Sequence, residues 1–133
     1  MKQTFKKEER LTNKKTFDSL FNSGQSISVS PFRLVWLESA SSPSLLLKER
    51  EVKAEVGISV PKKSFSKAVQ RNKIKRRIRE AYRKNKHLLY AFLEKKNHTV
   101  ALILIYTSKE ELPYNEIEQK MVVSLQKLIE KMK

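Results

Sequence analysis

The sequence predicts an α+β fold: a single-domain α/β sandwich in which three helices pack on a small, mostly antiparallel sheet of about four strands. Three observations support this prediction. Apolar and polar residues alternate over 52–60, residues 99–107 are nearly all apolar and β-branched, and 62–92 and 114–131 carry apolar residues at helical spacing. A length of 133 residues is typical of one domain, which we place at 11–133.

The chain begins with a polar, charged segment over 1–10, which predicts a flexible basic N-terminal arm. Residues 11–24 follow with a short amphipathic pattern that predicts a helix. Thr12 or Asn13 can cap the start of this helix, and Gly24 can take the left-handed conformation after its end.

Two strands are predicted next. Over 27–38 the alternation changes phase at Pro31, which predicts a bulge or a switch between two short strands. A loop rich in serine and charge follows over 39–51. The alternation over 52–60 predicts a second strand, which Pro61 ends.

A long helix is predicted after Pro61, capped by Ser64 or Ser66 and running to about Phe92. Residues 95–98 predict a turn. The apolar run over 99–107 then predicts a central strand covered on both faces.

The last predicted helix covers 114–131, and its apolar stripe comprises Ile117, Met121, Leu125, Leu128 and Met132. A strand, a long helix and another strand form a crossover unit if the two strands lie parallel.

Composition restricts the partners of this chain. There are 29 Lys and Arg against 14 Asp and Glu, a formal net charge of +15, and the isoelectric point is about 10.1. Nucleic acid is therefore the leading partner class, and an anionic membrane surface is the second. The chain has no Cys, and no apolar run long enough to cross a bilayer. With no secretory signal at its start, we expect a cytoplasmic protein that does not bind membranes.

The strongest signal is the basic stretch over 62–86, where twelve side chains are basic and only Glu80 is acidic. Its apolar stripe comprises Ile74, Ile78, Ala81 and Tyr82, extended by Leu89 and Phe92. One flank of that stripe carries Arg71, Lys75, Arg79, Tyr82 and Lys86, with Asn72, Arg76 and Arg83 just beyond. Crowded positive charges favour binding of a polyanion. The alternative is a solvated surface helix, but such helices usually interleave Glu at i,i+4.

The residues of this chain give little support to a catalytic function. A metal-dependent nuclease needs clustered carboxylates, whereas this chain has one Asp, Asp18, and scattered Glu residues. His87 and His98 are both expected at the surface, and a catalytic role is not expected for either. The chain has only two glycines, too few for a glycine-rich phosphate loop. We therefore predict recognition of nucleic acid, with no catalytic and no metal-binding residues in the protein.

Recognition by this chain can use three kinds of side chain. Arginine and lysine neutralise phosphates, and Asn72 can contact a base edge or a 2′-hydroxyl. Phe17 and Phe21 are either core residues or exposed platforms on which unstacked bases can stack. Nearby positive charge would come from Lys14, Lys15 and Arg33.

The basic stretch reads KKSFSKAVQRNKIKRRIREAYR over 62–83 and resembles the signature of the bacterial ribonuclease P protein component. In that family Lys-Lys leads through Ala-Val into Arg-Asn-Arg and a basic helix. The resemblance extends to LTNKKTFDSLFNSG at 11–24 and VGISVPKK at 56–63. It also includes 32–37, TVALILIYT at 99–107 and the last helix, so it covers nearly the whole chain from Leu11.

This resemblance implies the protein subunit of ribonuclease P, an endoribonuclease that removes the 5′ leader from precursor tRNA as a ribonucleoprotein. The catalytic RNA and its bound Mg²⁺ would perform the chemistry, and no protein partner is required. The small basic protein would bind that RNA and the leader, raise substrate affinity and lower the magnesium requirement. A left-handed β-α-β crossover is also implied, which is an exception to the usual hand.

Carried over by position, the resemblance assigns two sets of site residues. Those expected to bind the catalytic RNA are Lys62, Lys63, Lys67, Arg71, Asn72, Lys73, Lys75, Arg76, Arg79 and Arg83. Those expected in a central cleft for the single-stranded leader are Phe17, Phe21, Lys14, Arg33 and Val35.

The chain departs from the family pattern at two of these positions. Lys73 stands where the signature usually has arginine, which keeps the charge but loses the forked hydrogen-bond geometry. Val35 stands where some members carry an aromatic residue of the leader cleft. Trp36 points to the other face by alternation.

Three rival functions remain. A structural RNA-binding protein of the ribosomal type would need the same basic helix without any dependence on a leader. A stand-alone nuclease would cleave RNA without an RNA partner. A protein of anionic membranes would bind acidic lipid vesicles.

Overall fold

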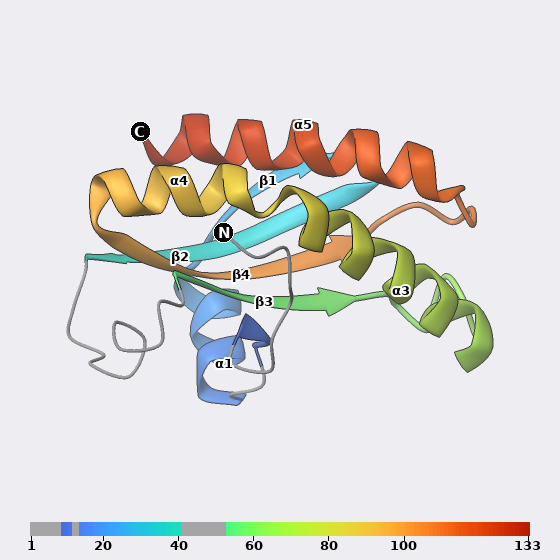
Figure 1. The fold of residues 1–133 in the computed structure, drawn as a ribbon. Helices are drawn as coiled ribbons and strands as arrows, with labels where there is room; N and C mark the ends of the chain where they lie inside the picture. The colour runs from blue at the N-terminus through green and yellow to red at the C-terminus, as the bar shows by residue number, and fades with distance from the viewer. Residues whose placement is uncertain (1–8, 12–13, 41–52) are drawn as a thin grey trace.

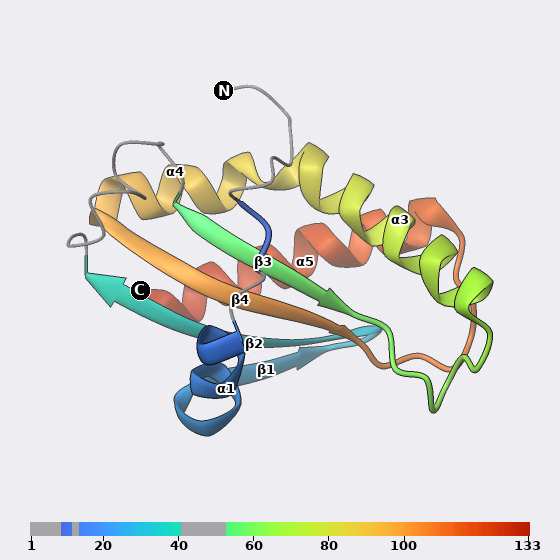
Figure 2. The same ribbon diagram turned by 90° about the horizontal axis from the view of Figure 1, so that it is seen from below.

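The structure is a computed structural model that describes residues 9–11, 14–40 and 53–133, with only the backbone described for 14–17, 21, 39 and 40. Its elements in chain order are α1 (Lys14–Ser23), β1 (Gln25–Val29), β2 (Phe32–Ala40), β3 (Ala54–Ser59), α3 (Ala68–Asn85), α4 (His87–Lys96), β4 (His98–Tyr106) and α5 (Tyr114–Met132). Helices α3, α4 and α5 form a layer on one face of the sheet, and α1 lies on the opposite face (Figures 1 and 2). The predicted α+β sandwich is confirmed.

The sheet is mixed, with the strand order β1-β2-β4-β3. Strand β2 pairs antiparallel with both β1 and β4, whereas β3 pairs parallel with β4. The parallel pair completes the predicted crossover unit, because α3 and α4 connect the end of β3 to the start of β4. Figures 1 and 2 show that this connection crosses the face that also carries α5. Seen from that face with both strands pointing upward, the chain passes from β3 on the right to β4 on the left, so the crossover is left-handed.

Alternation along the strands divides the buried residues between two faces. Phe32, Leu34 and Trp36 of β2 pack in the main core beneath α3, α4 and α5. Val35 of β2 and Ile103 of β4 belong to a smaller cluster on the α1 side, which also contains Leu11 and Leu20. Burial on both faces explains why β4 is almost entirely apolar, as predicted for a central strand.

The predicted last helix is confirmed as α5, and all five residues of its stripe are buried. The predicted strand over 52–60 is observed as β3, where Ala54 and Val56 are buried. Tyr106 packs edge-on against Phe32 with ring centroids 6.2 Å apart, which closes the core at one end of β4. Among the described residues, no helix is both long enough and apolar enough to span a bilayer.

The phase change at Pro31 marks a hairpin between two strands, which is one of the two outcomes predicted. Strands β1 and β2 pair in register around Ser30 and Pro31, whose peptide bond is cis. Strand β2 continues to Ala40, so the predicted loop starts two residues later than expected. The remainder of that loop lies outside the described residues.

Gly24 ends α1 for a different reason from the one predicted. Its backbone does not adopt the left-handed conformation, so that prediction is wrong. A Cβ atom at this position would lie 2.4 Å from the Leu20 carbonyl oxygen and 3.1 Å from the Val35 side chain. The close approach of this residue to the last turn of α1 and to β2 therefore requires glycine here. The predicted caps Thr12 and Asn13 lie outside the described residues.

The single long helix predicted after Pro61 is wrong, because it is divided into α3 and α4 at Lys86. Four helices are therefore described where three were predicted. The start also differs: Lys67 is the N-cap of α3 and makes no side-chain capping hydrogen bond, so neither Ser64 nor Ser66 caps it.

The predicted turn over 95–98 is shorter in the structure. Helix α4 continues to Lys96, Asn97 takes the left-handed conformation with φ of 57°, and β4 begins at His98. His98 is therefore a strand residue. Its side chain is 27% exposed and contacts Glu38, which corrects its predicted surface position.

Glu38 joins three elements at one end of the sheet. Its Oε2 atom lies 2.7 Å from Lys96 Nζ at the end of α4 and 2.5 Å from His98 Nδ1 in β4. Lys96 Nζ also donates a hydrogen bond to the carbonyl oxygen of Met132 in α5. Partial burial raises the pKa of Glu38, but hydrogen bonds from Lys96 and His98 outweigh it, so the pKa lies below its ordinary value of 4.5.

Acid should weaken the fold through this cluster. Because the folded pKa of Glu38 is lowered, its stabilising effect is present above pH 4.5 and is lost as the pH falls through the folded pKa. Urea unfolding between about pH 6 and about pH 3 checks this expectation. Glu38→Gln should be less stable than the parent at the upper pH, and the difference should shrink with acid. An exposed control, Glu94→Gln, should show no such convergence.

Candidate nucleic-acid interface

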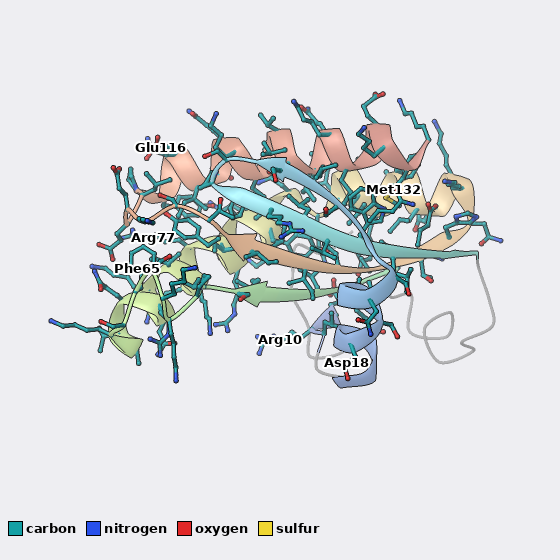
Figure 3. The ribbon with its side chains drawn as sticks, turned by 180° about the vertical axis from the view of Figure 1, so that it is seen from behind. Arg10, Asp18, Phe65, Arg77, Glu116 and Met132 are labelled. Carbon is teal, nitrogen blue, oxygen red and sulfur yellow. The ribbon has the colours of Figure 1, made fainter. Side chains whose placement is uncertain are left out.

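Helix α3 places its basic side chains on the side away from the core. Ile74, Ile78, Ala81 and Tyr82 are buried at the predicted helical spacing. Burial of this stripe fixes the rotation of the helix about its axis, so the opposite side faces solvent. Figures 1 and 3 show α3 extending beyond the end of the sheet, with side chains projecting from it.

A set of polar side chains that form no ion pair with a described residue lies on and before this exposed side. We call it the basic face, and it comprises Lys62, Lys63, Lys67, Asn72, Lys75, Arg76 and Arg79. All are exposed except Lys75, which is partly buried. None of them forms an ion pair with another described residue. Six positive charges thus lie on and before one side of α3 with no ion-pair partner among the described residues, which favours binding of phosphates.

Two other residues predicted to bind the catalytic RNA are paired with carboxylates. Lys73 Nζ lies 3.6 Å from Glu111 Oε1, and Arg83 Nη2 lies 2.6 Å from Glu80 Oε1. The hydrogen bond from Arg83 lowers the pKa of Glu80, so this carboxylate stays ionised. Ion pairs that solvent can reach contribute little to stability, so a phosphate can replace either carboxylate at little cost.

Arg71 is used within the protein. Its Nη1 atom donates hydrogen bonds to the carbonyl oxygens of Phe65, at 2.8 Å, and Ser66, at 2.9 Å. Phe65 is only 4% exposed, and its ring lies 6.0 Å from that of Tyr106. Arg71 therefore fixes the loop that carries Lys62 and the other lysines before α3, a role that the sequence did not reveal.

Arg77 was not among the predicted site residues, and the structure shows its separate role. It lies where α3 meets the segment before α5 (Figure 3). Its Nη1 atom donates a 2.7 Å hydrogen bond to the carbonyl oxygen of Leu112. Tyr106 fixes the same segment, because its hydroxyl donates to the Glu110 carbonyl at 2.6 Å and accepts from the Leu112 amide at 3.3 Å.

The predicted leader cleft corresponds to the sheet face that carries α1. Arg33 is exposed on this face, whereas Val35 is 5% exposed and packs in the cluster beneath α1. The backbones of Lys14, Phe17 and Phe21 belong to α1. Their side chains lie outside the described residues, so their contacts with a leader stay predictions, as do those of Arg33 and Val35.

Two residues beside Arg33 on this face were not named by the sequence analysis as candidates for contact with a leader. The strand register aligns Arg33 of β2 with Ile105 of β4, and Ile105 in turn with Ser59 of β3. Both neighbours are partly exposed on the α1 side of the sheet. Successive side chains of a strand lie on opposite faces, but β4 is nearly all apolar, so its sequence did not show which residues lie on the α1 side.

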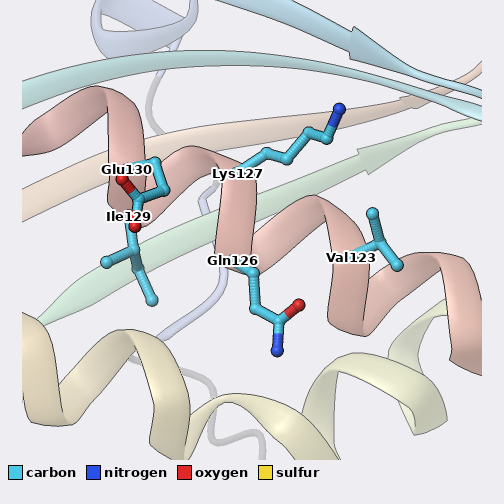
Figure 4. Close-up of a pocket in the computed structure, with 5 residues that line it drawn as sticks. All are labelled: Val123, Gln126, Lys127, Ile129 and Glu130. Carbon is cyan, nitrogen blue, oxygen red and sulfur yellow. The ribbon is translucent and has the colours of Figure 1, made fainter.

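No second site competes with these two surfaces in the described part of the chain. His87 is exposed at the start of α4, and His98 contacts Glu38. No three His, Asp or Glu side chains among the described residues form a group that could hold a metal ion. A shallow depression of about 500 Å³ lies on α5, lined by Val123, Gln126, Lys127, Ile129 and Glu130 (Figure 4). These five lining residues do not form a nucleophile–base or acid–base pair of the kind found in active sites.

Comparison with known proteins agrees with this geometry. The family described as Ribonuclease P matches residues 5–132. The ribonuclease P protein component of Porphyromonas gingivalis is 34% identical over 119 residues, which are 90% of this chain and 82% of the relative. That of Dictyoglomus turgidum is 38% identical over 90 residues, which are 68% of this chain and 66% of the relative.

Solved structures share the fold. The RNase P protein from Thermotoga maritima aligns with a TM-score of 0.66 at 22% sequence identity, covering 90% of this chain and 96% of that protein. The Staphylococcus aureus RNase P protein aligns with a TM-score of 0.60 at 23% identity, covering 91% and 97%. The chain therefore belongs to the ribonuclease P protein family, whose members are subunits of the ribonucleoprotein endoribonuclease that matures the 5′ ends of tRNA.

Proposed function

We propose that this subunit binds two different RNA ligands through two separate surfaces. The basic face binds the catalytic RNA of ribonuclease P, and the α1 side of the sheet takes the 5′ leader of precursor tRNA. The observation that carries the proposal is the basic face, whose six positive charges have no carboxylate partner among the described residues. Such a face is repulsive in isolation and becomes favourable when phosphates bind to it.

The chemistry of cleavage belongs to the RNA partner in this proposal. Mg²⁺ held by that RNA would activate water and stabilise the charge that develops on phosphate. Side chains of the basic face would neutralise phosphates of the folded RNA, so that less magnesium is needed to hold it compact. Precursor tRNA as the substrate supports a cytoplasmic location for the assembled enzyme.

Reconstitution tests the proposal directly. The protein is mixed with the catalytic RNA from the same cell, and cleavage of precursor tRNA is timed at low magnesium. Substrates carry leaders of one and of several nucleotides. We expect no cleavage by the protein alone, cleavage by the mixture, and a larger gain in affinity for the longer leader.

Two outcomes would contradict the proposal in different ways. RNA binding without any change in cleavage would favour a structural RNA-binding role of the ribosomal type. An equal gain for both leaders would leave the contact with the catalytic RNA but remove the leader from the α1 side of the sheet.

A further inference from the structure

Glu9 is a buried carboxylate that neither proposed surface uses. Its side chain is 5% exposed, and that of Lys86 is 4% exposed. Lys86 Nζ donates to both oxygens of Glu9, at 2.9 Å to Oε1 and 2.6 Å to Oε2, and the Tyr90 hydroxyl donates to Oε2 at 2.7 Å. We call these three residues the Glu9 cluster. The sequence prediction placed Glu9 in a flexible arm and Lys86 on a basic flank, and both placements are wrong.

The cluster connects the N-terminal segment to the junction of two helices. Lys86 is the residue between α3 and α4, and its ammonium lies 5.0 Å from the centre of the Tyr90 ring. Burial raises the pKa of Tyr90, and the hydrogen bond to Glu9 raises it further, so the hydroxyl remains a donor. A buried charge that loses its partner is strongly unfavourable, so these groups hold one another in place.

The segment after Glu9 leads directly to the α1 side of the sheet. Arg10 forms a parallel bridge with Val56, and the Leu11 amide donates a 3.0 Å hydrogen bond to the Val56 carbonyl. Leu11 is 5% exposed and shares a buried cluster with Leu20 of α1 and Ile103 of β4. Residues 9–11 therefore lie between the Glu9 cluster on the helix side and the packing of α1 on the other side.

We propose that Glu9 is a positioning residue for the leader-binding surface. Its ion pair with Lys86 fixes residues 9–11 along β3, and Leu11 in turn fixes α1 over the sheet. Loss of the pair would let α1 shift relative to Arg33 while the basic face keeps its geometry. The inference rests on the proposed function for its consequence in cleavage, but its first step concerns the protein alone.

Hydrogen exchange tests that first step without RNA. In Glu9→Gln the Leu11 amide should exchange about tenfold faster than in the parent, the scale of one lost charged hydrogen bond. The Thr107 amide, which donates to the Pro31 carbonyl at 2.7 Å beyond the far end of β4, serves as an internal reference and should not change. Glu130→Gln is the matched control, because its carboxylate pairs with Lys133 at 3.1 Å but is 71% exposed.

Unchanged Leu11 protection in Glu9→Gln would overturn the inference. If this variant exchanges rapidly throughout and so does not fold, Tyr90→Phe takes its place, because it removes one hydrogen bond and keeps the ion pair. Faster exchange at Leu11 with Thr107 unchanged is again the expected result. Equal acceleration at both amides would mean that the cluster only stabilises the whole fold, which would also overturn the inference.

Cleavage assays test the consequence for the leader. In the reconstituted enzyme, Glu9→Gln should lose most of the affinity gained from a longer leader, while its affinity for the catalytic RNA stays within about twofold. Equal losses in both affinities would overturn the positioning role. If the parent protein itself shows no gain from the leader, the proposed function fails at that surface, whereas the exchange result still decides whether Glu9 anchors residues 9–11.

Discussion

Replacing Arg76 and Arg79 together with alanine should weaken binding to the catalytic RNA by about 2–4 kcal/mol, because each arginine can make hydrogen bonds between charged groups. Both side chains are exposed on α3 and have no ion-pair partner among the described residues. Their removal therefore leaves no buried charge behind, and the melting temperature should stay nearly constant. Filter binding or fluorescence titration at several salt concentrations measures the effect.

A charge-matched variant separates local contact from overall charge. Lys127 and Lys131 are exposed on α5, and replacing both with alanine also removes two positive charges. This control should retain nearly the full affinity. The Arg76 and Arg79 variant should also show a shallower dependence of log affinity on log salt, by about 0.7–0.9 for each phosphate that it no longer neutralises. Equal losses in the two variants would mean that net charge, and not the basic face, determines affinity.

The sequence predicted best the strands and helices whose apolar residues recur at a regular spacing. Alternation identified β3, and the helical stripe identified α5 and five of its six buried residues, all but Ser124. Parity along β2 correctly separated Trp36 in the main core from Val35 on the α1 side. These signals are local, because they arise from the period of each element, and they need no knowledge of what packs against it.

The helix break at Lys86 had no such signal. The stretch around it contains neither Gly nor Pro, and its apolar period continues through Leu89. What separates α3 from α4 in the structure is a residue whose ammonium pairs with Glu9, 77 positions earlier in the chain. Sequence periodicity cannot reveal an ion pair between such distant residues, and charge patterning alone assigned both partners to solvent.

The candidate site also combines features that the sequence predicted with contacts that it could not predict. The orientation of α3 and the exposure of Arg76 and Arg79 followed from its apolar stripe. Arg71 and Arg77 belong to the same basic run, yet the structure uses both to hold neighbouring backbone carbonyls. The sequence predicted a positively charged surface correctly, but the arginines that shape it could be recognised only from their contacts.

Truncating Lys86 to alanine should lower the free energy of unfolding by about 3–5 kcal/mol, the scale for breaking a buried ion pair by removing one partner. Glu9 would remain at the junction with its charge buried and would lose the two hydrogen bonds from Lys86, while keeping the one from the Tyr90 hydroxyl. Domains of this size usually have a total stability of about 5–15 kcal/mol, so the loss is a large fraction of the whole. Urea unfolding followed by circular dichroism measures it.

Two comparisons show whether the charge is responsible. Lys95→Ala removes an exposed lysine from α4 and should cost less than about 0.5 kcal/mol. Glu9→Leu combined with Lys86→Met removes both charges and fills the space with apolar groups, so it should recover most of the stability lost in Lys86→Ala. If the double variant is as unstable as Lys86→Ala, the junction depends on the hydrogen bonds of the cluster themselves. If Lys86→Ala is no less stable than Lys95→Ala, the pair contributes nothing to the fold, and the break between α3 and α4 needs another cause.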